Sequence, residues 1–282
     1  MKPFLTRTIS AVVYVILFLG TLLSGRLLHH PRLGLVLFGL FLLFVTVGCT
    51  FEFFRLVERQ GAKPNRLLGY ILAVSALVIV GIIPLMELYP GFVLMMGCVM
   101  MMPALFGLSA IVQLWGKSEQ PFREATYTMV PMLYVAVPLS LMLALIPNVG
   151  ARVVIMIIVM VWVNDSAAYI GGSLFGRKKL WERHSPGKTW EGTLFGVLVT
   201  LMVAVFLCPM VQPLVAWYHW LALGLICSVV DTLGDLVESQ LKRSVGVKDS
   251  GSIMPGHGGF LDRFDSLLII MPFAYAYINI VL

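Results

Sequence analysis

Charged residues are scarce in this chain of 282 residues. Asp, Glu, Lys and Arg make up 12% of the sequence, about half the share usual in a soluble domain, while hydrophobic residues make up 59%. So few charged groups cannot give a chain of this length an ordinary water-exposed surface. The composition therefore excludes a typical soluble globular protein and predicts an all-α, polytopic integral membrane protein.

Cysteine motifs and a basic surface are also lacking. The cysteines lie inside apolar runs with no Cys-x-x-Cys or Cys/His spacing, so neither a disulfide framework nor a zinc site is expected. The formal net charge is +6, but the basic residues are few and scattered between apolar runs. We therefore expect no nucleic-acid partner.

About nine apolar runs are long enough to cross a bilayer, which takes roughly 20 helical residues. No internal repeat, low-complexity tract or long linker separates them. We therefore predict a single membrane domain, with N-terminal spans in residues 1–150 and catalytic spans and cytoplasmic loops in residues 151–282. The expected spans are residues 9–28, 33–53, 67–88, 91–114, 127–146, 151–172, 192–211, 215–241 and 265–282.

The Lys and Arg residues are distributed unequally between the two sides of the membrane that these nine spans define. With a cytoplasmic N-terminus, only three of the 20 Lys and Arg residues fall on the far side, namely Arg26, Arg32 and Arg152. Basic residues in short loops favour the cytoplasm. The pattern predicts a multi-pass protein of the cytoplasmic (inner) membrane, with the N-terminus and the two richest loops, 173–191 and 242–264, facing the cytoplasm.

Asp165 lies well inside an apolar run, where a carboxylate is costly and is first interpreted as functional. The alternative is that Asp165 pairs with a neighbouring helix for packing. Ala167, Gly171 and Gly172 leave a surface of small residues on the same helix, so a close helix contact is expected in either case.

The loop that follows reads GRKKLWERHSPGKTWEG. It is not a phosphate-binding P-loop, because Glu182 stands where that motif requires glycine. Ser185, Lys188 and Thr189 lie in a Gly/Pro turn preceded by several basic residues, a composition suited to phosphate. The alternative is a simple cytoplasmic anchor.

The stretch 231–265 combines acidic, basic and glycine residues beside two apolar runs. Asp231, Asp235, Glu238 and Lys242 are spaced by four, three and four residues and so share one helical face. A polar stripe on an otherwise apolar helix must face protein or water.

Asp262 and Asp265 share a face at the start of the last span, where they could converge on a divalent cation. Carboxylates without cysteine or clustered histidine favour Mg²⁺. His257 has three open roles: general base, phosphate donor or loop support. Glycines nearby let backbone N–H groups approach a phosphate closely.

The segment SQLKRSVGVKDSGSIMPGHGGFLDRFDS, residues 239–266, resembles the signature of the phosphatidate cytidylyltransferases, also called CDP-diacylglycerol synthases. The preceding GDLVES and the upstream SPGKTWEG are similar to other marked segments of that family. The resemblance covers residues 150–282, while the earlier spans match only in hydropathy and length. Ala167 departs from the family pattern, in which glycine is common, and Asp231 is an additional acid.

The resemblance implies a Mg²⁺-dependent nucleotidyltransferase of phospholipid biosynthesis, which joins CTP to phosphatidate and releases pyrophosphate. Its partners would be CTP, phosphatidate and the lipid bilayer; a second cation and assembly into a homo-oligomer stay open. The resemblance makes three carboxylates metal ligands: Asp235, Asp262 and Asp265. Further catalytic positions are Lys242, Arg243, Lys248, Asp249, His257 and Arg263. Positions on the nucleotide side are Ser185, Lys188, Thr189, Glu191 and Asp165.

Other functions remain open at this point. A CTP-dependent lipid kinase, or a cytidylyltransferase for another lipid phosphate, would need similar groups. In a cation- or proton-coupled transporter, Asp165, Asp231 and Asp235 would line a path. In a structural scaffold, Asp262→Asn would be silent.

Overall fold

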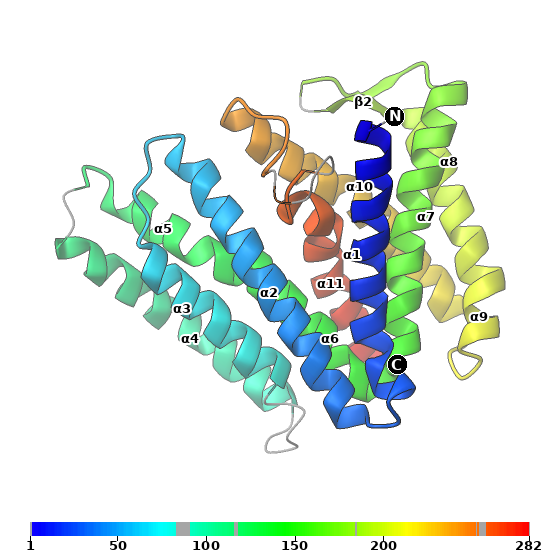
Figure 1. Ribbon diagram of the computed structural model, residues 1–282, viewed down its shortest axis with the longest axis horizontal. Helices are drawn as coiled ribbons and strands as arrows, with labels where there is room; N and C mark the ends of the chain where they lie inside the picture. Colours follow the sequence, from blue (N-terminus) through cyan, green and yellow to red (C-terminus); the bar gives the residue numbers. More distant parts are fainter. Residues whose placement is uncertain are drawn as a thin grey trace. The chain divides into compact units, whose positions relative to one another are not determined.

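The computed structural model describes residues 2–82, 91–115, 118–183, 185–251, 253 and 258–281, with side chains from residue 9 onward except those of 82 and 91–100. The chain is predominantly helical (Figure 1), which confirms the all-α class. Among the described residues, seven helical stretches are long and apolar enough to cross a membrane. Two others, Arg66–Gly81 and Met101–Trp115, are apolar but shorter. The protein is therefore a multi-pass membrane protein, and the total of nine spans stays a prediction.

The first of two compact units comprises Met1–Pro147 and Asp249–Arg263. Within it, α2 packs against α1, α3 and α5, and a buried apolar cluster that includes Leu72 and Met132 joins α3 to the segment after α5. Its helical elements are α1 (Lys2–Leu27), α2 (Pro31–Glu58), α3 (Arg66–Ala76), η1 (Leu77–Ile82), α4 (Gly91–Val112), η3 (Gln113–Trp115), α5 (Pro121–Pro131), η4 (Met132–Ala136) and all but the last two residues of α6 (Val137–Val149).

Local sequence explains where helices of this unit begin. Pro31 occupies the first position of α2, where its missing N–H costs nothing. Asn65 caps α3, because its side chain accepts a hydrogen bond of 2.9 Å from the N–H of Leu68.

The second unit comprises Asn148–Lys248 and Phe264–Leu282. Its helical elements are α7 (Ala151–Phe175), α8 (Trp190–Met202), η5 (Val203–Leu207), α9 (Cys208–Val211), α10 (Trp217–Ser244) and all but the first three residues of α11 (Leu261–Val281).

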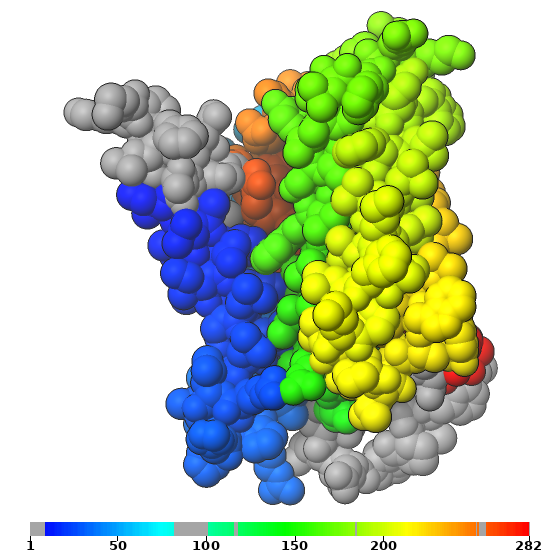
Figure 2. Space-filling view, turned by 90° about the vertical axis from the view of Figure 1, so that its right-hand side faces the viewer, coloured from blue at the N-terminus to red at the C-terminus, as the bar shows by residue number. Residues whose placement is uncertain are grey.

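Helices α7 and α8 lie side by side along much of their length (Figure 2). A β-carbon added at Gly192 would lie 2.7 Å from the carbonyl oxygen of Ala168 on α7, and Gly172 lies opposite Gly192. Gly171 is covered by the side chain of Phe195. These contacts confirm the close helix packing predicted from the small residues of α7.

One face of the segment after Trp190 carries an apolar stripe. Leu194, Leu198, Met202 and Phe206 are each more than half exposed and recur every four residues. A stripe of this kind on a chain with several membrane-length helices is suited to contact with lipid tails.

A short hairpin precedes α8 and was not predicted from the sequence. Strands β1 (Lys179–Trp181) and β2 (Ser185–Thr189) are antiparallel, with Lys179 opposite Thr189 and Trp181 opposite Ser185. The hairpin leads directly into α8, whose first residue donates a hydrogen bond of 3.0 Å from its N–H to the carbonyl of Lys178. The described residues of this predicted loop therefore form a hairpin that continues into the start of α8.

Candidate active site

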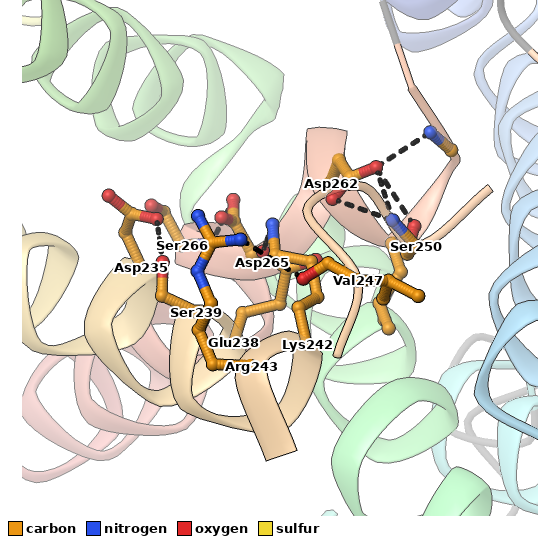
Figure 3. A network of polar contacts seen from close by, with 12 residues as sticks. Asp235, Glu238, Ser239, Lys242, Arg243, Val247, Ser250, Asp262, Asp265 and Ser266 are labelled. Carbon is orange, nitrogen blue, oxygen red and sulfur yellow. Dashed lines mark hydrogen bonds and ion pairs between the residues drawn. The ribbon is translucent and has the colours of Figure 1, made fainter. Parts of the chain in front are cut away.

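Three carboxylates of the second unit lie together (Figure 3). Asp235 and Glu238 are three residues apart on α10, and Asp265 is on α11. One oxygen from each lies within 4.8 Å of the others. Oxygens around Mg²⁺, at about 2.1 Å from the ion, are separated by roughly 3–4 Å, so small side-chain rotations would close this set around an ion. The all-oxygen donors fit a hard cation.

Two lysines pair with this acidic cluster. The Nζ of Lys188, from β2, lies 2.7 Å from Oδ2 of Asp235 and donates to the carbonyl of Thr232 at 3.3 Å. Lys242 forms an ion pair with the fully buried Glu238 one turn earlier on α10. The structure therefore brings the hairpin, predicted to bind phosphate, to the acidic face of α10.

A buried polar network lies beside the cluster. The amide of Asn164 on α7 donates to Oδ2 of Asp231 at 2.5 Å, and Asp231 is 1% exposed. The hydroxyl of Thr200 on α8 donates to the side-chain oxygen Oδ1 of Asn164 at 3.5 Å. Asn164 thereby links three helices around the additional acid.

Asp165 completes the acidic surroundings. It interacts electrostatically with Asp231, Asp265 and Asp235, and with the opposite charge of Lys188. Like charges on neighbouring carboxylates repel one another, and a bound cation would relieve that repulsion.

Residues at the end of α10 have simpler surroundings. The side chain of Arg243 donates from Nη1 to the carbonyl of Val247 at 3.1 Å, which closes the end of the helix. Lys248 and Asp249, which follow, are exposed. Their predicted part in catalysis stays a prediction.

Three residues predicted to face the nucleotide lie in the hairpin or at the start of α8, and two of them form hydrogen bonds that stabilise this region. The hydroxyl of Thr189 accepts a hydrogen bond of 3.2 Å from the N–H of Gly192 and so caps α8. The Glu191 carboxylate accepts from the N–H of Arg177 at 3.0 Å and from that of Lys178 at 3.1 Å. Ser185 begins β2. These contacts leave their predicted role toward a nucleotide untested.

Asp262 belongs to the first unit and holds a loop there (Figure 3). Its Oδ2 accepts hydrogen bonds from the N–H of Ser250 at 2.9 Å and from the N–H of Gly259 at 2.8 Å. Gly258 has a φ of +82°, and a β-carbon there would lie 2.5 Å from the same oxygen, so glycine is required. Asp262 is not in the three-carboxylate group, and its assignment as a metal ligand stays a prediction.

The two remaining predicted residues, His257 and Arg263, lie within the signature segment 239–266. Arg263 is exposed, and its N–H donates to the carbonyl of Phe260 at 3.0 Å. His257 lies outside the described residues.

Sequence reasoning missed three polar residues. Glu238 was placed on the polar face of its helix but not chosen as a ligand. Asn164 could have been noticed as the polar neighbour of Asp165 inside an apolar run. Glu52, near the end of an apolar run, was not selected as a site residue, and it is 1% exposed in α2.

The fold and the site define a class: a multi-pass helical membrane protein whose acidic cluster, flanked by lysines, suits a hard cation and phosphate groups. The chain belongs to the cytidylyltransferase family, because the model of that family matches residues 5–281.

The names of curated relatives are consistent with this family. A protein of Staphylococcus saprophyticus named phosphatidate cytidylyltransferase is 33% identical over 269 residues, covering 94% of this chain and 95% of the relative. A protein of Staphylococcus aureus (strain COL) with the same name is 32% identical over the same shares. A Bacillus subtilis protein of that name is 49% identical over 117 residues, and there the match spans 42% of this chain and 44% of the relative.

Proposed function

We propose that this protein transfers CMP from CTP to phosphatidate, giving CDP-diacylglycerol and pyrophosphate. The observation that carries the proposal is similarity over nearly the whole chain to relatives named phosphatidate cytidylyltransferase. The acidic cluster with its two lysines supports it, since the reaction brings together two polyanions.

The reaction needs alignment more than an enzymic base. The second pKa of a phosphate monoester is about 6, so phosphatidate is mostly dianionic at neutral pH. Its oxygen forms a bond to the α-phosphorus of CTP, while the bond from that phosphorus to the bridging oxygen breaks and pyrophosphate leaves with the electron pair. No covalent enzyme intermediate is required.

Residues of the second unit would carry out the alignment. Asp235, Glu238 and Asp265 would hold Mg²⁺, which when bound neutralises phosphate charge and stabilises the leaving pyrophosphate. Lys188 and Lys242 pair with two of these carboxylates and would provide positive charge beside the phosphates.

CTP is a water-soluble nucleotide, whereas phosphatidate keeps its acyl chains in the bilayer. The distribution of Lys and Arg supports a site that faces the cytoplasm, with the N-terminus on the same side. The apolar stripe on the segment after Trp190 supports the bilayer as the surrounding medium.

CTP radiolabelled at its α-phosphate tests this proposal. Purified protein with phosphatidate and Mg²⁺ should transfer the label into lipid and release one pyrophosphate for each labelled lipid. Omitting phosphatidate should abolish the transfer.

Other functions predict different outcomes of the same assay. A CTP-dependent lipid kinase would leave the label in water-soluble CDP. A transporter would move cations across proteoliposomes without CTP. A scaffold would give neither result, and Asp265→Asn would leave its assembly unchanged.

A further inference from the structure

The buried carboxylate of Glu52 accepts hydrogen bonds from residues 250, 260 and 261, which belong to the same unit. Its Oε1 accepts a hydrogen bond of 3.0 Å from the N–H of Phe260, and its Oε2 accepts one of 2.9 Å from the N–H of Leu261. The hydroxyl of Ser250 lies 2.8 Å from the same Oε2. These partners are separated from Glu52 by about 200 residues of sequence, so α2 is tied to the segment by this side chain.

The two N–H groups are those that begin α11. Leu261 is its first residue and Phe260 precedes it, so neither N–H has an acceptor within the helix. A carboxylate at that end also interacts favourably with the helix dipole. Glu52 therefore caps α11 from another helix, a role usually taken by a residue of the same chain segment.

The neighbouring glycines fit this role. A β-carbon at Gly259 or at Gly251 would collide with the Glu52 carboxylate, and one at Gly48 on α2 would lie 2.6 Å from the ring of Phe260. In the first unit, Gly251 and Gly259 thus let a carboxylate of the protein reach the backbone.

Glu52 is also linked to Asp262. The hydroxyl of Ser250 lies 3.0 Å from Oδ2 of Asp262, between the two carboxylates. Asp262 binds the N–H groups of Ser250 and Gly259, while Glu52 binds those of the next two residues. Together the two acids order the backbone before and at the start of α11.

We propose that Glu52 is a positioning residue for the reaction, one that fixes Ser250 and the backbone that leads into the N-terminus of α11 at Phe260 and Leu261. This inference rests on the proposed function. Asp265 follows Leu261 by four residues on the same helix, so a shift of the helix start displaces this carboxylate. Loss of the cap would therefore slow the reaction by displacing Asp265, because Glu52 itself does not touch the substrate.

Three variants test the role. Glu52→Gln keeps the shape and removes the charge, Glu52→Asp keeps the charge and shortens the side chain, and Glu58→Gln is the control. Glu58 ends the same helix and pairs with Arg66 near the surface. We expect Glu52→Gln to lower kcat about 100-fold, as for a displacement of about 1 Å, with a much smaller change in KM for CTP. Glu52→Asp should retain more of the kcat, and Glu58→Gln all of it.

Amide hydrogen exchange gives a readout independent of activity. In Glu52→Gln, peptides containing residues 258–261 should exchange faster, while those of α7 and α8 keep their protection. Unchanged exchange at 258–261 overturns the proposal whatever the activity, as does a wild-type kcat. If Glu52→Gln does not fold, the same comparison is made with Glu52→Asp. If the wild-type protein makes no labelled lipid, the proposed function fails, while the exchange result still tests the cap.

Discussion

Removing the charge of Asp265 tests the cation site without relying on catalysis. Asp265→Asn keeps the size of the side chain but removes one of three charges in the cluster. Two unit charges at the upper limit of 4.8 Å for this group repel by about 3.5 kcal/mol at an effective dielectric constant of about 20. Lys188 and Lys242 pair with the other two acids and offset part of this repulsion. We therefore expect the variant to be more stable than wild type without divalent cations, by on the order of 1–3 kcal/mol.

In Mg²⁺ we expect the opposite order of stability, with wild type more stable than Asp265→Asn. A ligand that binds only the folded protein stabilises it by about 2.7 kcal/mol at 100 times its Kd. Thermal unfolding of the protein in detergent micelles, followed by tryptophan fluorescence, should show a higher Tm in Mg²⁺ than in EDTA. Asp265→Asn should need at least about tenfold more Mg²⁺ for half of that shift.

A matched control is Glu119→Gln, which removes an exposed acid from the first unit and should keep the wild-type response. The cation site would be refuted if Asp265→Asn responded to Mg²⁺ like wild type. It would also be refuted if chelation left the wild-type Tm unchanged.

Two other contacts of the second unit give further predictions. Lys188→Ala removes the cation 2.7 Å from Asp235 and should lower kcat/KM for CTP by about tenfold to 100-fold, with partial recovery in Lys188→Arg. Steady-state kinetics in which Lys188→Ala matched wild type would contradict this. Asn164→Leu leaves the buried Asp231 without its amide donor and should reduce the free energy of unfolding by about 3 kcal/mol. Thermal unfolding beside Asn148→Ala, a control at an exposed asparagine, measures this; equal loss in the two variants would argue against the network.

Much of the helical architecture follows from the sequence, because long apolar runs need helices to satisfy their backbone in a bilayer. The close packing of α7 on α8 was likewise visible in Gly171 and Gly172. The hairpin at 179–189 was not, since strands of three and five residues leave little periodic signal.

Site residues could be predicted from the sequence where their interaction partners lie on the same helical face, a few residues away. The spacing of Asp235, Glu238 and Lys242 placed them on one helical face, where the structure has them. The same reasoning grouped Asp262 with Asp265, but the oxygens of Asp262 bind backbone N–H groups that spacing does not reveal. Glu52 was missed because a charge near the end of an apolar run looks interfacial, and its partners lie about 200 residues away.

The central claim is tested most directly by the fate of the α-phosphate of CTP. Purified protein, phosphatidate and Mg²⁺ should yield lipid that carries the α-phosphate label, together with an equal amount of pyrophosphate, and Asp265→Asn should yield far less. Label that stays in water-soluble CDP, or lipid that stays unlabelled with folded wild-type protein, would contradict the account.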